Sequence, residues 1–520
     1  MFRHLQSKKY ILISLLAAAL CVGGIIRMTR GPTSESARPG TTLVVWCASG
    51  IKGPMEELSL LYERAYNTRV NIRYGGTGTL LGGIEASHQG DLLVAADSSY
   101  LTDLREKKLA AESIPLATMR PVLAVAKGNP KQIRGWKDLL ERADIKFGLC
   151  HPHTAAIGRT IHDIADRRGD WIALTNHSAV QKSTVTELSA DLLAGALDAA
   201  FLWDQMVGSM PGLEAVPCPE LKGASATVPA IVLTSCERPS SALHFARWLA
   251  SPEHGAPVFR SHHFQAEGGD AWQEAPEMTL FSGSVNRPAI ERILEDFCQR
   301  EGARVKTVYN GCGVLCATMR AAEANSASLP DAYYACDICF VPPVADLFSE
   351  AVRVTETDLV IAVPAGNPHG IRTLSDLAKP GLRLGVCDVK QSALGFLTER
   401  LLDRSALLAA VGERVVSRVP TGDLLVNQLR AGSLDAAIVY RSNLATLNGA
   451  IVPVPIDHPA AKAVQPYAVG DKSRHRQLAA RLLDAVLADT DPIVNAGFRM
   501  VPDPAPVPSE SFAAPGFEKQ

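Results

Sequence analysis

The chain carries the same sequence pattern twice, and this duplication constrains its fold more than any other feature. Three segments recur in the same order, at offsets of 235, 240 and 237 residues: Tyr74–Gly78 (YGGTG) as Tyr309–Gly313 (YNGCG), residues 91–97 as residues 331–337, and Gly195–Trp203 (GALDAAFLW) as Gly432–Tyr440 (GSLDAAIVY). This period is far too long for a solenoid repeat. The sequence therefore predicts two related domains in tandem.

The repeat sets the domain boundaries. Module 1 is expected at residues 42–267 and module 2 at residues 276–501, with a short polar linker at residues 268–275. A short linker of this kind holds two domains close together. Residues 502–520 are rich in Pro, Ser and Ala, and this composition predicts a disordered tail.

The first 30 residues are predicted to be a targeting segment. Basic residues between Arg3 and Lys9 precede an apolar run from Tyr10 to Ile26, which is the secretory pattern. The run lies at the short end for a membrane span, so a cleaved signal peptide and an uncleaved signal anchor both remain open. A polar linker at residues 31–41 follows. The remainder is expected to be exported, to the periplasm or another extracytoplasmic location, either free or anchored by this apolar helix.

The charge balance excludes some classes of partner. Lys and Arg number 52 against 54 Asp and Glu, which gives a formal net charge of −2. The chain lacks the excess of basic residues that would indicate a nucleic-acid partner. The hydrophobic fraction of 47% suits a globular α/β protein.

Strand and helix signals alternate within each repeat. Short apolar, β-branched runs at residues 43–46, 70–74 and 121–126 predict buried strands, and the last of these returns at residues 359–364. Such alternation predicts an α/β fold with mostly parallel sheets and helices on both faces. In these sheets ligands bind at the carboxyl ends of the strands.

Polar or small residues stand at the expected strand ends in both copies. The matched pairs are Ser49 with Ser284, Thr77 with Cys312 in the glycine-rich turn, the loops 148–158 with 385–395, and Trp203 with Tyr440. Hydroxyl groups and free backbone N–H groups at a helix start favour a bound anion. Glycine in such a turn lets the backbone approach a ligand closely.

No catalytic motif accompanies these positions. Ser49 has no G-x-S-x-G elbow around it, and no P-loop or H-E-x-x-H motif is present. We therefore expect neither an enzyme nor a bound cofactor.

Four cysteines, Cys312, Cys316, Cys336 and Cys339, occur in module 2 without cysteine counterparts in module 1. Their spacing resembles that of a four-thiolate metal site. A disulfide and plain packing of small buried side chains are the other two interpretations, and the sequence leaves all three open.

The ordered set of motifs resembles the periplasmic molybdate-binding proteins of ABC importers, within the type II solute-binding superfamily. The residues that carry the resemblance are Ala48-Ser49, the turn from Tyr74 to Leu80, residues 91–97, the Gly-Asn-Pro turn at 128–130, the loop 148–158 and residues 197–203, together with their second copies. The resemblance covers both repeats. It implies two tandem modules, each of two lobes that close over a tetrahedral oxyanion.

The same resemblance implies the ligand-binding residues. They are Ser49, Thr77, Ile157, Val185 and Trp203 in module 1, and Ser284, Cys312, Leu394, Gly422 and Tyr440 in module 2, with Ile157 and Val185 acting through the backbone. Two positions depart from the family pattern. Trp203 replaces the usual tyrosine, and Cys312 replaces the usual second hydroxyl, so we expect the two clefts to differ.

The function implied is that of an exported substrate-binding protein, which captures an oxyanion such as molybdate or tungstate and delivers it to an ABC permease. One alternative is a membrane-anchored sensor or scaffold that uses the fold for another small ligand. The other is a thiol- or metal-binding role for module 2.

Overall fold

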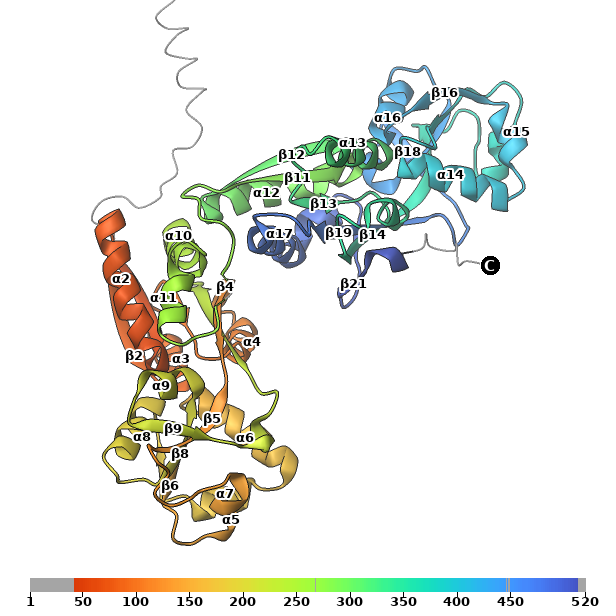
Figure 1. The fold of residues 1–520 in the computed structure, drawn as a ribbon. Helices are drawn as coiled ribbons and strands as arrows, with labels where there is room; N and C mark the ends of the chain where they lie inside the picture. The colour runs from red at the N-terminus through yellow and green to blue at the C-terminus, as the bar shows by residue number, and fades with distance from the viewer. Residues whose placement is uncertain (1–41, 267, 446, 448, 513–520) are drawn as a thin grey trace, which may run out of the picture.

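The computed structural model describes residues 42–266, 268–445, 447 and 449–512. The predicted targeting segment, the linker at 31–41 and residues 513–520 lie outside this part. Within it, the two modules have separate hydrophobic cores, one formed between Leu43 and Ala266 and the other between Met278 and Phe512. The prediction of two tandem α/β modules is confirmed (Figure 1).

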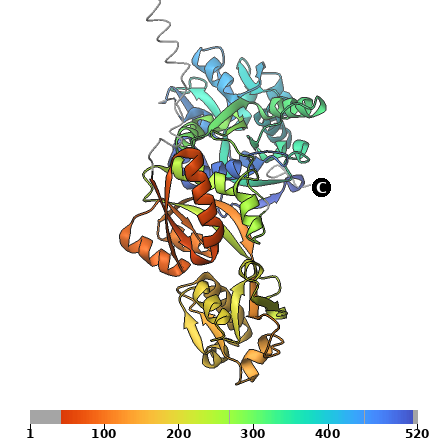
Figure 2. The same ribbon diagram turned by 60° about the vertical axis from the view of Figure 1, so that its left-hand side comes forward.

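Module 1 consists of two lobes, each built on a five-stranded sheet. The strand orders are β2-β1-β3-β10-β4 in lobe 1 and β7-β6-β8-β5-β9 in lobe 2. Figure 2 shows lobe 2, in yellow, below lobe 1. The strands are β1 (Thr42–Ala48), β2 (Arg69–Gly75), β3 (Leu92–Val94), β4 (Ala110–Met119), β5 (Pro121–Ala126), β6 (Phe147–Cys150), β7 (Val180–Lys182), β8 (Ala199–Trp203), β9 (Leu213–Val216) and β10 (Ala226–Leu233). The helices are η1 (Ser49–Ile51), α2 (Lys52–Tyr66), α3 (Thr77–Ser87), α4 (Ser99–Glu106), α5 (Trp136–Glu141), α6 (Ala156–Arg168), α7 (Trp171–His177), α8 (Val185–Leu193), α9 (Asp204–Ser209), η2 (Pro219–Leu221), α10 (Pro239–Ala250) and α11 (Gly255–Ser261).

Module 2 repeats this arrangement with its two sheets joined through one long strand. The strands are β11 (Glu277–Gly283), β12 (Arg304–Asn310), β13 (Ala332–Tyr334), β14 (Glu350–Pro364), β15 (Leu384–Cys387), β16 (Val415–Val419), β17 (Ala436–Tyr440), β18 (Ile451–Pro455), β19 (Lys462–Val469), β20 (Arg499–Met500) and β21 (Pro506–Pro508). The helices are η3 (Ser284–Asn286), α12 (Arg287–Glu301), α13 (Cys312–Ala324), η4 (Ile338–Phe340), η5 (Pro342–Val344), η6 (Leu374–Ala378), α14 (Ala393–Arg404), α15 (Leu408–Gly412), α16 (Gly422–Arg430), η7 (Arg441–Leu444), α17 (Arg476–Ala488), α18 (Thr490–Asn495) and η8 (Ser509–Ser511).

The parallel strands expected from the sequence form one half of each sheet. In lobe 1, β1 pairs in parallel with β2 and β3, whereas β10 runs antiparallel to β3 and β4. The strand that crosses between the lobes differs between the modules. Module 1 breaks it into β4 and β5 at Arg120, and module 2 keeps it continuous as β14.

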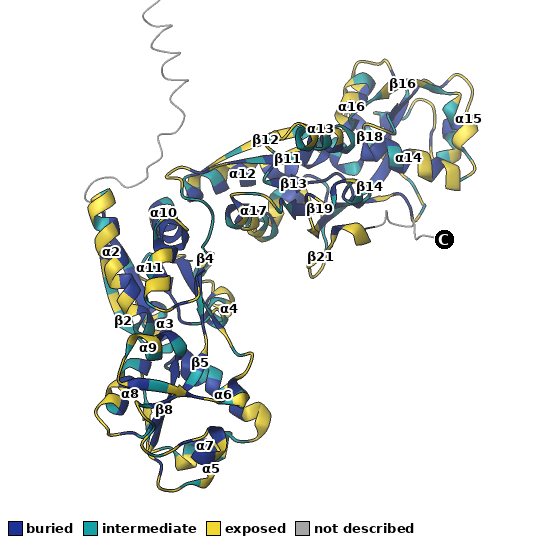
Figure 3. Cartoon of the chain, viewed as in Figure 1, coloured by how far each residue is buried: buried dark blue, intermediate teal, exposed yellow. Residues whose placement is uncertain are grey.

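Both copies end their first long helix in the same way. The chain leaves α2 at Asn67 with φ of 50° and leaves α12 at Gly302 with φ of 61°. A residue in this left-handed conformation closes a helix by satisfying its last carbonyls. The sheets are buried, and the exposed residues gather on the outer faces of the helices (Figure 3).

A buried ion-pair network joins the modules. Glu301 of module 2 is fully buried and accepts hydrogen bonds from Arg247 of module 1 and from Arg481, at 3.0 Å and 2.5 Å. Burial by itself would raise the pKa of Glu301, but the two guanidinium groups outweigh it and lower the pKa. In the linker, the carboxylate of Asp270 accepts hydrogen bonds from the backbone N–H groups of Gln477 and Leu478 in the first turn of α17.

The prediction of disorder after residue 502 is wrong for the described part of the tail. β21 pairs with β14, and Phe512 is buried in the core of module 2. Composition misled here because a few apolar contacts suffice to hold a short segment against an existing sheet edge. In the described part of the chain, no helix has the length and apolar character to cross a membrane.

Candidate functional site

The five positions predicted for module 1 line one narrow cleft between its lobes, which is partly open to solvent. Lobe 1 contributes the first residues of η1 and α3. Lobe 2 contributes the second residue of α6, the first residue of α8 and the last residue of β8. In that order they are Ser49, Thr77, Ile157, Val185 and Trp203. Helix starts from both lobes therefore meet at one place.

The lining of this cleft is uncharged throughout. Besides the five predicted residues it consists of Ala48, Gly50, Gly75, Gly76, Ala96, Ala155 and Ala156. Helix N-termini carry a partial positive charge and unpaired N–H groups. A cleft with this lining offers an anion hydrogen-bond donors and dipoles without a counter-charge.

Thr77 is held in a fixed orientation at the edge of this cleft. Its side chain is 1% exposed, and its hydroxyl oxygen accepts a hydrogen bond from the backbone N–H of Ala96 at 3.3 Å. Accepting this bond leaves the hydroxyl hydrogen free to donate. Thr77 can therefore act as a donor whose position is set by strand β3.

The glycine-rich turn also brings the two lobes into contact, a role that the sequence did not suggest. A Cβ at Gly78 would lie 1.8 Å from the carbonyl oxygen of His153 in lobe 2, and the Gly78 N–H donates to the Thr154 carbonyl at 3.0 Å. In module 2, a Cβ at Gly313 would lie 1.9 Å from the carbonyl oxygen of Lys390. These glycines admit the backbone of the opposite lobe. Both modules are thus held in a closed arrangement.

Trp203 fits its cleft because its neighbour is small. A Cβ at Gly50 would already lie 3.3 Å from Val185 Cγ1 and 3.5 Å from Trp203 Cδ1, so a larger side chain there has no room. Module 2 has Val285 at the position of Gly50 and the smaller Tyr440 at the position of Trp203. Module 2 also has Gly422 at the position of Val185, so the valine and the glycine have exchanged places between the two modules.

Module 2 places its five predicted residues at the equivalent points. Ser284, Cys312, Leu394 and Gly422 lie in the first turns of η3, α13, α14 and α16, and Tyr440 ends β17. The hydroxyl of Tyr440 is buried and has no hydrogen-bond partner among the described atoms. Burial is the main cause that raises the pKa of Tyr440 well above its ordinary value, and repulsion from the nearby Cys336 and Asp337 adds to it. A buried hydroxyl of this kind is available for a ligand.

Two of the four module 2 cysteines meet close to these positions. The sulfur atoms of Cys312 and Cys336 lie 2.7 Å apart, and the Cys336 N–H donates to Cys312 Sγ at 2.9 Å. Cys316 instead contacts the Phe340 carbonyl at 3.4 Å. The ten described cysteines are free thiols. The described residues contain no group of three or more His, Cys, Asp or Glu placed to hold a metal ion, so the four-thiolate arrangement is not assembled.

Two buried polar residues behind the clefts were not singled out from the sequence. Gln205, 2% exposed, donates to the Gly50 carbonyl at 3.0 Å, and Asn286, 1% exposed, donates to the Tyr334 carbonyl at 3.0 Å. Gln205 thereby holds the backbone next to Ser49, and Asn286 holds the end of β13. Their one signal in sequence is a position shortly after a strand end, which many surface residues share.

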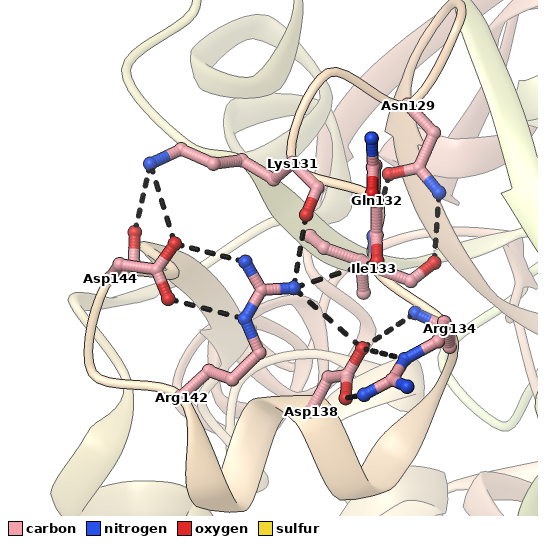
Figure 4. A network of polar contacts seen from close by, with 8 residues as sticks. All are labelled: Asn129, Lys131, Gln132, Ile133, Arg134, Asp138, Arg142 and Asp144. Carbon is pink, nitrogen blue, oxygen red and sulfur yellow. Dashed lines mark hydrogen bonds and ion pairs between the residues drawn. The ribbon is translucent and has the colours of Figure 1, made fainter.

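The Gly-Asn-Pro turn proves to be part of the scaffold (Figure 4). Asn129, with φ of 44°, exchanges hydrogen bonds with the backbone of Ile133 at 2.8 Å and 2.9 Å. Asn367 does the same with Ile371 in module 2, at 2.7 Å and 3.0 Å. The ion pair between Arg134 and Asp138 next to this turn lowers the pKa of the carboxylate.

Comparison with known proteins identifies one family across both modules. The sequence model of the bacterial extracellular solute-binding proteins matches residues 43–265 and again residues 278–499. A protein of Haemophilus influenzae named "Putative binding protein" is 27% identical over 158 residues, which is 30% of this chain and 64% of that protein's length. The molybdate-binding protein ModA of Mycobacterium tuberculosis is 22% identical over 243 residues, covering 45% of this chain and 91% of ModA.

Solved structures that are similar to part of this chain include three binding proteins with different ligands in their names. They are the periplasmic molybdate-binding protein of Azotobacter vinelandii (18% identity, TM-score 0.38, 43% of this chain and 98% of that one), the sulfate-binding protein SubI of Mycobacterium tuberculosis (19%, 0.37, 44% and 88%) and a periplasmic thiamin-binding protein (15%, 0.40, 44% and 85%).

Proposed function

The chain belongs to the bacterial extracellular solute-binding protein family through both of its modules, and we propose that it captures a tetrahedral oxyanion, molybdate or tungstate, for an ABC importer. The observation that carries this proposal is the cleft of module 1, where helix starts from two lobes meet around an uncharged lining. Preorganised N–H and O–H donors offset the cost of removing an anion from water.

The absence of charge from the lining favours an oxyanion over a cationic solute. A buried cation needs a carboxylate or an aromatic face close by. The residues that line the cleft of module 1 include no Asp or Glu, and Trp203 is the single aromatic residue among them. Hydroxyl and amide groups can donate hydrogen bonds to an anion that keeps its full charge.

The remaining parts of the proposal follow from the family. A solute-binding protein of this kind works outside the cytoplasm and passes its ligand to a membrane permease. Closure of two lobes around the ligand is a hinge motion, and the strand that crosses between the lobes is its natural pivot. Anchoring through the apolar segment before residue 31 is a separate part of the proposal.

Titration calorimetry on the purified full-length protein, with molybdate, tungstate and sulfate, tests the proposal. We expect binding of molybdate or tungstate, with a thermal shift that grows with ligand concentration. Sulfate separates a general oxyanion site from one built for the larger anions. No heat and no thermal shift with any of the three would contradict the proposal.

A further inference from the structure

Two residues that line the cleft of module 1 are both exchanged in module 2. In module 1 they are Ala48 and Ala96. Their counterparts in module 2 are Gly283 and Cys336. A Cβ at Gly283 would lie 2.4 Å from Cys336 Sγ. The glycine thus leaves the space that the sulfur of Cys336 occupies.

A second exchange brings another sulfur to the same point. Thr77 in module 1 accepts a hydrogen bond from the Ala96 N–H, and Cys312 in module 2 accepts the equivalent bond from the Cys336 N–H. The shared backbone geometry therefore directs Cys312 toward residue 336. Because that residue is a cysteine, the two sulfur atoms lie 2.7 Å apart.

We propose that Cys312 and Cys336 form a reversible disulfide at the place where module 1 has Thr77 and Ala96. A disulfide S–S bond measures about 2.05 Å, so the sulfurs need to approach by less than about 1 Å. An exported protein meets an oxidising compartment in which such bonds persist. Free thiols elsewhere in the described chain lack this juxtaposition; Cys316, for example, contacts a carbonyl and a hydroxyl.

The oxidant is a low-molecular-weight disulfide such as oxidised glutathione. Cys312, as the thiolate, attacks one sulfur of the reagent, forms a mixed disulfide and releases one thiol. Cys336 then loses its proton, attacks Cys312 Sγ, forms the intramolecular bond and releases the second thiol. The protein loses two protons and two electrons, and the reagent is reduced to two thiols.

The two thiols differ in pKa, as this two-step reaction requires. Burial alone would raise the pKa of Cys312, but hydrogen bonding with the Cys336 side chain, Tyr333 and the Cys336 N–H lowers it. The hydrogen bond to Cys312, together with burial, raises the pKa of Cys336 well above its ordinary value. Cys312 is thus the attacking group and Cys336 the resolving one.

Lobe opening controls access to the pair. Cys312 is 0% exposed and Cys336 is 4% exposed. The start of α13 lies against the second lobe of module 2, where the Gly313 N–H donates to the Gln391 carbonyl at 3.1 Å. A soluble disulfide can reach Cys312 only after this contact opens. Oxidation would then replace the S–H group at the position where module 1 has its Thr77 hydroxyl.

The test uses full-length protein, reduced and then incubated with excess oxidised glutathione. After acid quenching, free thiols are alkylated in denaturant and mapped by mass spectrometry. We expect a Cys312–Cys336 peptide pair lighter by two hydrogen atoms, while Cys47, Cys150 and Cys387 remain alkylated. Recovery of both Cys312 and Cys336 as alkylated thiols would overturn the proposal.

Two variants sharpen the result. Cys336→Ala restores the module 1 residue and removes the resolving thiol, so Cys312 should retain glutathione as a mixed disulfide. Gly313→Ala places a Cβ against the Lys390 carbonyl and should accelerate formation of the internal disulfide by opening the cleft. An oxidation rate unchanged in Gly313→Ala would contradict the access step. Circular dichroism checks the fold of both variants, and the wild-type mapping stands without them.

Discussion

At the scale of single residues, the two clefts differ in which hydroxyl groups they carry. Module 1 has Thr77 with its oxygen tied to a backbone N–H and its hydrogen free. Module 2 has a thiol at this place and adds the buried, unpaired hydroxyl of Tyr440. A hydrogen bond to a charged ligand contributes about 1.5–3 kcal/mol. Removing either hydroxyl group is therefore expected to change the affinity of its own module for the ligand.

Thr77→Val should weaken molybdate binding by module 1. The change removes the hydroxyl but keeps the shape of the side chain, and the loss of one charge-assisted bond corresponds to roughly 10- to 100-fold in affinity. Calorimetry of the variant measures it. Thr77→Ser, which keeps the hydroxyl, is the matched control and should bind within a few-fold of the wild type. Equal affinity in the valine variant would rule out Thr77 as a ligand.

Tyr440→Phe should separate stability from binding in module 2. Removing a buried hydroxyl that has no partner leaves the free energy of unfolding unchanged or raises it by up to about 1 kcal/mol. Affinity for the oxyanion at the second site should fall. The control is Tyr467→Phe, which removes a bond to the Ala479 carbonyl of 2.9 Å and should lower stability by about 1 kcal/mol. Urea unfolding and calorimetry give the two readouts; a Tyr440 variant with reduced stability and unchanged affinity would refute this role.

At the scale of elements, the start of helix α3 is the point where the lobes of module 1 touch. The backbone of lobe 2 approaches so closely that only glycine fits at residues 76 and 78. Helix α13 repeats this contact in module 2 through Gly311 and Gly313. We therefore expect the glycine-rich turn to control closure of the lobes, and with it the assembly of the proposed ligand site.

Gly78→Ala should keep the lobes of module 1 apart. Its Cβ would meet the His153 carbonyl at 1.8 Å, so the closed state becomes unfavourable and oxyanion affinity should fall at least about tenfold, since affinity scales with the population of the closed form. Gly82→Ala, on the same helix with no atom within 4 Å of its Cβ, should bind normally and gain about 0.5–1 kcal/mol of stability. Small-angle X-ray scattering should show expansion in the first variant alone. Similar affinities for the two variants would disprove the closure role.

At the scale of the whole molecule, a buried carboxylate couples two modules that have separate cores. Glu301 pairs with Arg247 across the boundary and with Arg481 within module 2. Removing one partner of a buried network leaves an uncompensated charge, which typically costs about 3–5 kcal/mol. The modules are therefore expected to unfold together in the wild type.

Glu301→Gln should lower the unfolding free energy by about 3–5 kcal/mol and separate the unfolding of the two modules in calorimetry. Glu291→Gln, which breaks the exposed pair with Arg287, should stay within about 0.5 kcal/mol of the wild type. One cooperative transition at unchanged temperature in Glu301→Gln would show that the network does not couple the modules.

The same carboxylate predicts a pH dependence. The folded-state pKa of Glu301 is lowered from its ordinary value of 4.5, so its stabilising contribution is present above that value and is lost as pH falls below it. We expect acid unfolding of the wild type to be steeper below about pH 4.5 than that of Glu301→Gln. Chemical denaturation between pH 3 and pH 7 measures the difference. Parallel profiles for the two proteins would contradict this assignment.

Much of the architecture was predictable because local patterns encode it. Apolar runs of strand length placed β1, β2 and β5, and the duplicated motifs divided the chain into two modules. The ten candidate positions all lie at helix starts or strand ends, where alternation of strand and helix must put them. The order of residues 506–512 was not predictable, since it depends on an edge of β14 far away in the sequence.

The sequence by itself determined the two modules, their α/β elements and the helix starts that form each cleft, because these follow from hydrophobic periodicity and turn residues within short segments. Only the tertiary structure decided that Gly78 meets His153, that Cys312 meets Cys336 and that Glu301 pairs with Arg247. Each of these pairs joins residues far apart along the chain. Their contact depends on how sheets and lobes pack in three dimensions, which no local pattern records.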